Sequence, residues 1–199
     1  MSHARLERAR RLGLTHATAE AYYHRGLLAY RNRDMENAIL DLSEAIYYDR
    51  RYPEYYATRG LFYVEDGKLA EAEADLLYAL KLNKRLWLAH FALGVLRYKQ
   101  NEFEAAHQHF LQATRHPDAK PEAWFYLAVT HYLMDNLLEA LQAIELAANG
   151  FHQADSRQTE VRRWKTEIEK AIANRAPQPS TEGTSRRRRG RRATSTSTD

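Results

Sequence analysis

Small and large apolar residues recur along this chain at a fixed interval of 34 residues. The small residues form three sets: Gly26, Gly60, Gly94 and Ala128; Ala38, Ala72, Ala106 and Ala140; Ala45, Ala79, Ala113 and Ala147. Between the two alanines of each unit lies one large apolar residue: Leu42, Leu76, Phe110 or Ile144. A period of this length without insertions predicts a stacked repeat array, and such arrays usually act as binding surfaces.

The pattern inside each unit predicts two helices. In the first unit, Tyr22, Gly26 and Ala29 follow the spacing of one helix face, and Ala38 and Leu42 begin a second amphipathic stretch. Turn-forming residues separate the two stretches in every unit: Asn32 to Asp34, Asp66 and Gly67, Asn101, Asp135 and Asn136. Each unit is therefore expected to be a helix hairpin. Because small side chains let helix axes approach closely, the glycines are expected where the two helices cross.

The units resemble tetratricopeptide repeats. The resemblance rests on an early aromatic residue (Tyr22, Tyr56, Trp124), the glycine or alanine that follows it, and the paired alanines around a large apolar residue, and it covers about residues 19–152. His90 departs from the pattern in the third unit, and the tyrosine usual one turn after the glycine is kept only at Tyr63. The resemblance implies an all-α fold: an α-solenoid of four helix hairpins in a right-handed superhelix, with the first helices lining its concave face.

The expected organisation has four parts. A basic N-terminal extension with a short helix covers 1–17, and the repeats cover 18–152 as units 19–52, 53–86, 87–120 and 121–152. An amphipathic helix within 153–174 is expected to cap the last repeat, because an array would otherwise expose an apolar end. Residues 175–199 carry seven arginines against two acidic residues and few apolar ones, so this tail is expected to be disordered.

The first helices place apolar and aromatic side chains along the predicted concave face. This candidate groove consists of Tyr23, Leu27, Tyr30, Leu61, Phe91, Val95, Tyr98, Phe125, Val129 and Tyr132. Glu20, Glu54 and Glu122 are expected at one acidic rim, with Glu65 on a neighbouring face. A continuous stripe of this kind usually marks a contact site. The alternative is that some of these aromatic residues fill the interior of the superhelix, as aromatic residues at helical spacing often do.

One groove type known in the family grips a C-terminal carboxylate with lysine, asparagine and arginine side chains. The matching positions here hold Tyr23, Leu27, Thr58, Leu88 and Ala92, none of which is of those types. The resemblance therefore implies no such carboxylate clamp in the first three units. An apolar groove with an acidic rim is instead suited to an apolar helix or extended segment that is flanked by basic residues.

The net charge of +4 is concentrated in the tail, because residues 175–199 carry +5 and residues 1–174 carry −1. Six arginines form a candidate anion-binding cluster: Arg186, Arg187, Arg188, Arg189, Arg191 and Arg192. They could hold nucleic acid or anionic lipid, serve only as a solubilising terminus, or fold back on the acidic rim. Sequence-specific nucleic-acid readout is not expected, since the tail has no aromatic residue to stack on bases.

No pattern in the sequence points to catalysis. His107 and His109 are two residues apart on a helix and face different directions, so they are not expected to share an ion. The sequence has no cysteine, no phosphate-binding glycine loop and no nucleophile elbow. We therefore expect no enzyme activity, no catalytic residue, no metal and no cofactor. No run approaches the ~20 apolar residues that a membrane span needs, and residues 1–17 lack the apolar core of a signal peptide. A cytoplasmic location is the resulting expectation.

These observations favour a scaffold that binds another protein or peptide in the apolar groove. Two alternatives remain open. In one, the same apolar surface mediates self-assembly, and in the other, the arginine-rich tail anchors the chain to nucleic acid or to an anionic surface.

Overall fold

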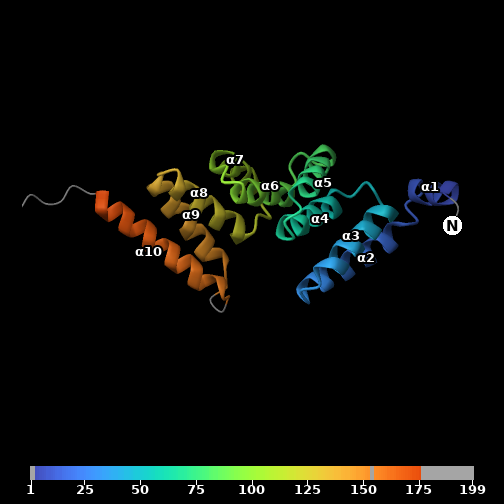
Figure 1. Ribbon diagram of the computed structural model, residues 1–199, viewed down its shortest axis with the longest axis horizontal. Coiled ribbons are helices and arrows are strands. Elements are labelled where there is room, and N and C mark those ends of the chain that lie inside the picture. Colours follow the sequence, from blue (N-terminus) through green and yellow to red (C-terminus); the bar gives the residue numbers. More distant parts are fainter. Residues whose placement is uncertain (1–2, 153–154, 176–199) are drawn as a thin grey trace, which may run out of the picture.

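The structure is a computed structural model that describes residues 3–152 and 155–175. These residues form ten helices and no strand, which follow one another as a row of paired rods (Figure 1). The predicted all-α solenoid is thereby confirmed. The helices are α1 (His3–Arg11), α2 (His16–Arg31), α3 (Met35–Tyr48), α4 (Pro53–Glu65), α5 (Leu69–Leu82), α6 (Trp87–Lys99), α7 (Phe103–Thr114), α8 (Pro121–Leu133), α9 (Leu137–Gly150) and α10 (Arg157–Arg175).

Consecutive helices pack in hairpins: α2 with α3, α4 with α5, α6 with α7, and α8 with α9. Each hairpin then contacts the next: α3 meets α4, α5 meets α6 and α7 meets α8, and the first helices α4 and α6 also pack together. Helix α10 packs on α9 at the end of the row (Figure 1). Within the described residues, no helix is both long and apolar enough to cross a membrane.

A left-handed backbone residue stands at the same place in each hairpin turn. Arg33, Gly67, Asn101 and Asp135 have φ values of 63°, 80°, 62° and 69°, and they are 34 residues apart. Only the second of these is glycine, the residue for which this conformation is least costly. At the helix starts, Pro53 and Pro121 occupy the first turn of α4 and α8, where the missing N–H costs nothing. The sequence period is therefore a period in backbone geometry as well.

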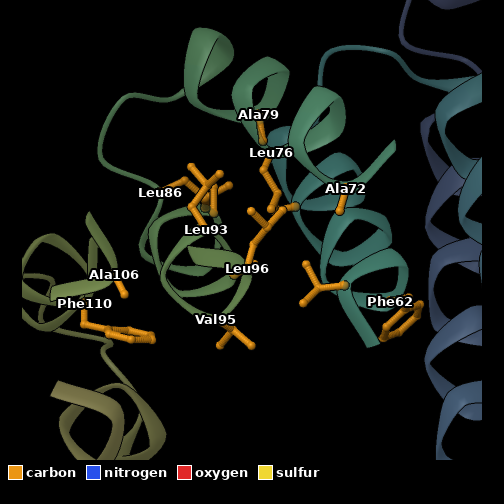
Figure 2. Close-up of a cluster of buried hydrophobic side chains, with 14 of the residues drawn as sticks. Phe62, Ala72, Leu76, Ala79, Leu86, Leu93, Val95, Leu96, Ala106 and Phe110 are labelled. Atoms are coloured by element: carbon orange, nitrogen blue, oxygen red, sulfur yellow. The ribbon is translucent and has the colours of Figure 1, made fainter. Parts of the chain in front are cut away.

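The repeated glycines lie under the large apolar residue of the second helix. A Cβ atom at Gly60 would lie 2.7 Å from Cγ of Leu76, and one at Gly94 would lie 2.5 Å from a ring carbon of Phe110. Both distances are shorter than side chains tolerate, and both partners are fully buried (Figure 2). Gly26 meets Leu42 in the same way. The close approach expected from the sequence is present, and the side chain that needs the space lies between the paired alanines.

The first two hairpins each contain an ion pair across their helices. The guanidinium of Arg25 donates to Asp41 at 2.7 Å, and that of Arg59 donates to Asp75 at 2.7 and 2.8 Å. The Arg59 pair is the more enclosed. Burial acts to lower the pKa of Arg59, but the hydrogen bond to Asp75 and the charge of that carboxylate outweigh it, so the pKa is raised. In the third hairpin the equivalent positions hold Leu93 and His109.

Helix α10 turns an apolar face to the array and a charged face outward. Val161 and Ile168 are 1% and 0% exposed, whereas Arg162, Glu167 and Glu169 are exposed. Lys165 reaches across to Glu145 of α9 at 2.8 Å. This arrangement covers the apolar side of the last hairpin, which is what stacked repeats need at their ends.

Candidate functional site

An open pocket of about 560 Å³ lies over α4, α6, α8 and the start of α10, and we call it the groove. Its lining is mainly apolar and aromatic. The apolar lining residues are Leu61, Trp87, Leu88, Phe91, Val95, Phe125, Phe151 and Val161; the polar or amphipathic ones are Tyr30, Glu65, Lys99, Lys120, Glu122, Tyr126, Arg157 and Glu160. A concave site of this size and composition is typical of ligand and peptide sites.

The floor of the groove is anchored in the hydrophobic core. The Tyr126 ring stacks on Phe110 with centroids 5.3 Å apart, and Phe91 meets Tyr126 edge to face at 5.9 Å. Phe110 is fully buried and itself covers Gly94. Because these rings are held from below, the floor is a preformed surface rather than a set of free side chains.

One end of the groove carries Tyr30, Glu65 and Lys99. The hydroxyl of Tyr30 donates to both carboxylate oxygens of Glu65 at 2.8 and 2.9 Å, and its ring stacks on Phe62 at 4.4 Å. Burial, together with the hydrogen bond to Glu65, raises the pKa of Tyr30 to about 12. The ammonium of Lys99 donates to the carbonyl oxygen of Val64 at 2.9 Å. This end is therefore hydrogen-bonded within the protein.

The other end carries a charge network between α8 and α10. Arg157 donates to Asp155 at 2.9 and 2.6 Å and also pairs with Glu122. The hydrogen bonds from Arg157 lower the pKa of Asp155 to about 2. Lys120 and Glu160 also line this part of the groove, and within 3–152 and 155–175 neither forms an ion pair.

The structure brings about half of the predicted groove residues together. Five of the ten apolar residues line the groove: Tyr30, Leu61, Phe91, Val95 and Phe125. The five that do not are Tyr23, Leu27, Tyr98, Val129 and Tyr132. Of the three predicted rim carboxylates, Glu122 lines the groove and Glu20 and Glu54 do not. The charges around the groove are of both signs, because Lys99, Lys120 and Arg157 accompany the carboxylates.

Most of the five predicted residues that do not line the groove pack against neighbouring side chains instead. Tyr23 packs on Tyr55 with ring centroids 5.2 Å apart. Tyr98 lies against both Phe103 and Tyr126.

Two more of these residues lie in the last repeat. Tyr132 meets Trp164 of α10 edge to face at 5.5 Å, and Val129 is only 2% exposed. Helix α10 therefore covers this end of the predicted apolar stripe. Val129 is buried and Tyr132 packs against α10, and neither lines the groove.

The sequence interpretation missed several groove residues, two of which, Leu88 and Trp87, are marked by the repeat register. Leu88 takes the position at which the other units carry Glu20, Glu54 and Glu122, so the repeat register alone marks an apolar interruption of the rim. Trp87 likewise replaces the proline found at 53 and 121. Phe151, Arg157 and Val161 lie outside the first helices and join the groove only through the placement of α10.

The remaining predicted features concern metals and the tail. In the part of the chain that the structure describes, no group of three or more histidine, cysteine, aspartate or glutamate side chains could hold a metal ion. The arginine cluster Arg186–Arg189, Arg191 and Arg192 lies outside the described residues.

Comparisons with known proteins identify the repeat. The family model described as tetratricopeptide repeat matches residues 2–56, 58–119 and 91–156. Tetratricopeptide repeat protein 16 from Homo sapiens is 30% identical over 122 residues, and the one from Macaca fascicularis gives the same figures. The match covers 58% of this chain and 14% of either relative, so the chain spans about one seventh of the curated relatives it matches.

Solved structures agree on the fold. The tetratricopeptide repeat protein TTC0263 from Thermus thermophilus has a TM-score of 0.63 at 22% identity, covering 82% of this chain and 87% of that one. YrrB, described as a tetratricopeptide repeat protein with an unusual peptide-binding site, has a TM-score of 0.58 at 18% identity, covering 86% and 85%. The family match spans most of the chain, and the helix hairpins repeat at the same interval. This chain belongs to the tetratricopeptide repeat family.

Proposed function

We propose that this chain is a protein-binding scaffold whose groove takes a short apolar segment of a partner protein. The observation that carries the proposal is the preformed apolar groove of about 560 Å³ that α4, α6, α8 and α10 leave open to solvent. Trp87, Leu88 and Phe125 are half-buried there. A partner that covers them would gain roughly 25 cal/mol for each Å² of apolar surface removed from water.

The charges around the groove narrow the chemistry of the segment. Glu122 is already paired with Arg157, and Glu65 already accepts from Tyr30. Lys120 and Glu160 are left at the α8–α10 end without an ion pair among the described residues. We infer a segment with large apolar side chains and, at that end, an acidic and a basic residue that meet these two. Such rim charges contribute more to orientation and association rate than to affinity.

The fold supports this proposal without identifying the partner. Stacked helical repeats create extended concave surfaces that are used for binding, and the similar structure of YrrB is described as having a peptide-binding site. The carboxylate-clamp positions here hold Tyr23, Leu27, Thr58, Leu88 and Ala92, none of which offers a positive charge or a side-chain amide to a chain terminus. An internal apolar segment is therefore the better fit.

Selection from a displayed library of random peptides tests the proposal. We expect the chain to enrich peptides with two or more large apolar residues at helical or alternating spacing, accompanied by charges of both signs. Counter-selection uses a variant with a blocked groove, Leu61→Glu with Phe125→Glu. The proposal is contradicted if no sequence class is enriched, or if the blocked variant enriches the same peptides.

A further inference from the structure

Two histidines face each other where the third hairpin meets the fourth. His107 lies on α7 and His131 on α8, and their Nε2 atoms are 3.3 Å apart with ring centroids 4.5 Å apart. Both side chains are half-buried. The Nδ1 atom of each ring is buried and has no hydrogen-bond partner among the described residues. The pair therefore depends on a single shared contact between two imidazoles.

The repeat register shows what the other joints place at this position. Moving the pair back by one repeat gives Glu73 and Arg97, which form an ion pair between α5 and α6. Moving it back by two repeats gives Ile39 and Tyr63, a half-buried apolar combination on α3 and α4. The same place in the solenoid thus holds an apolar pair, an ion pair and a histidine pair in turn. Of these three, only the histidine pair can change its charge between about pH 5 and 8.

Protonation of both rings of this pair is only partly compensated in the fold. When both rings are neutral, the Nε2–H of one can donate to the Nε2 of the other. When both are charged, two cations face each other at 3.3 Å, and each ring carries an Nδ1–H that is buried without an acceptor. Burial lowers the pKa of both His107 and His131, the latter also through His107. The carboxylate of Glu139 on α9 acts to raise the pKa of His131, but it offsets only part of this lowering.

We propose that the contact between α7 and α8 is a proton-sensitive joint, which loosens when the His107–His131 pair is protonated and so changes the spacing of the third and fourth hairpins. Because Phe91 of α6 and Phe125 of α8 lie on either side of this joint and line the groove, the same event weakens binding there. That second consequence rests on the proposed function, whereas the loosening of the joint does not.

The direction of the effect follows from the pKa shifts. The unfolded chain has ordinary histidines with a pKa of about 6.5, and the folded pair has lower values. The unfolded state therefore binds more protons below about pH 6.5, and the joint loses stability as the pH falls. Above that range both states are neutral and the contribution of the pair is constant. A second pair, His90 and His109 with Nδ1 atoms 3.3 Å apart and Arg97 nearby, has lowered pKa values in the same direction.

Variants that test the joint can be copied from the residue pairs at the equivalent positions of the other hairpin contacts. His107→Glu with His131→Arg installs the ion pair of the preceding joint, and His107→Ile with His131→Tyr installs the apolar pair of the first joint. Both leave His90 and His109 unchanged as a common background. Amide hydrogen exchange of α7 and α8 in the free protein, with α2 and α3 as the internal reference, is compared at about pH 7.5 and about pH 5.5.

We expect wild-type α7 and α8 to lose more protection than either variant at the lower pH, because the folded pair binds protons less readily than the unfolded chain. Equal pH dependence in all three proteins would overturn the proposal. Should the variants not fold, an NMR titration of the wild-type imidazoles decides it: the proposal requires His107 and His131 to titrate below the ordinary histidine range, and ordinary titration overturns it. Both measurements use the unbound protein, so a failure of the proposed function would not affect them.

Discussion

Replacing Phe110 with alanine is expected to lower the free energy of unfolding by about 3–5 kcal/mol, the range for large buried aromatic residues. Phe110 is fully buried, stacks on Tyr126 and fills the space above Gly94. The glycine has no side chain that could move into the cavity, so little of the loss can be recovered by relaxation. Urea denaturation followed by far-ultraviolet circular dichroism measures the change.

The matched control for Phe110→Ala is Leu77→Ala. Leu77 lies on α5, the equivalent second helix of the preceding hairpin, and is 54% exposed. Its replacement is expected to change stability by less than about 0.5 kcal/mol. Because repeat arrays need not unfold in one step, hydrogen exchange in α7 and α8 should show the loss locally. A loss of less than about 1 kcal/mol for Phe110→Ala would mean that the packing of this ring on Gly94 and Tyr126 does not stabilise the array.

The double variant Leu61→Glu with Phe125→Glu is expected to weaken capture of a library-selected peptide at least thirtyfold, which is about 2 kcal/mol. Leu61 of α4 and Phe125 of α8 both line the groove. Two carboxylates there would have to be desolvated by an apolar partner without compensation. Fluorescence anisotropy of the labelled peptide measures the affinity.

Leu77→Glu with Leu138→Glu serves as the control for the groove variant. These residues lie on α5 and α9, are 54% and 64% exposed, and do not line the groove. The control adds the same charge and should leave the affinity within about threefold of wild type, since surface changes away from the contact cost little. Equal loss in both variants would indicate a general charge effect, and no loss in either would place the binding surface elsewhere.

The repeat architecture could be predicted from the sequence because one constraint recurs at three glycines, Gly26, Gly60 and Gly94. Gly60 must leave room for Leu76, and Gly94 must leave room for Phe110, so the 34-residue period records a contact and not only a composition. At Gly26 and Gly60 the contact also includes the backbone carbonyl of the first alanine of the pair, Ala38 or Ala72. Sequence periodicity identifies which residues face each other on average, but not which atoms come closest.

The groove was predictable only in part. Tyr30, Phe91 and Phe125 were identified because first-helix positions point to the concave face of a regular array. The repeat pattern predicts Tyr132 in the groove, but it does not line it. Helix α10, which is not part of a repeat, covers that end of the array and packs Trp164 against Tyr132. Arg157 joined the groove for the same reason. A contact made by an element outside the period has no counterpart in the other units, so the repeat pattern contains no signal for it.

The mixed charge around the groove also arises from residues that do not follow the repeat pattern. Glu20, Glu54 and Glu122 share a register and predicted an acidic rim, but the third unit carries Leu88 in that register. Lys99 and Lys120 come from the end of α6 and the loop before α8. The groove therefore lies where the repeats deviate from their own consensus.

Site-specific photo-crosslinking shows whether a peptide binds in the groove. A benzoylphenylalanine at position 88 places the reactive group in the groove, and the same residue at position 77 places it on an exposed second helix. With a library-selected peptide, we expect a crosslink from position 88 that excess unlabelled peptide abolishes, and none from position 77. A crosslink from position 77 with none from position 88 would contradict groove binding.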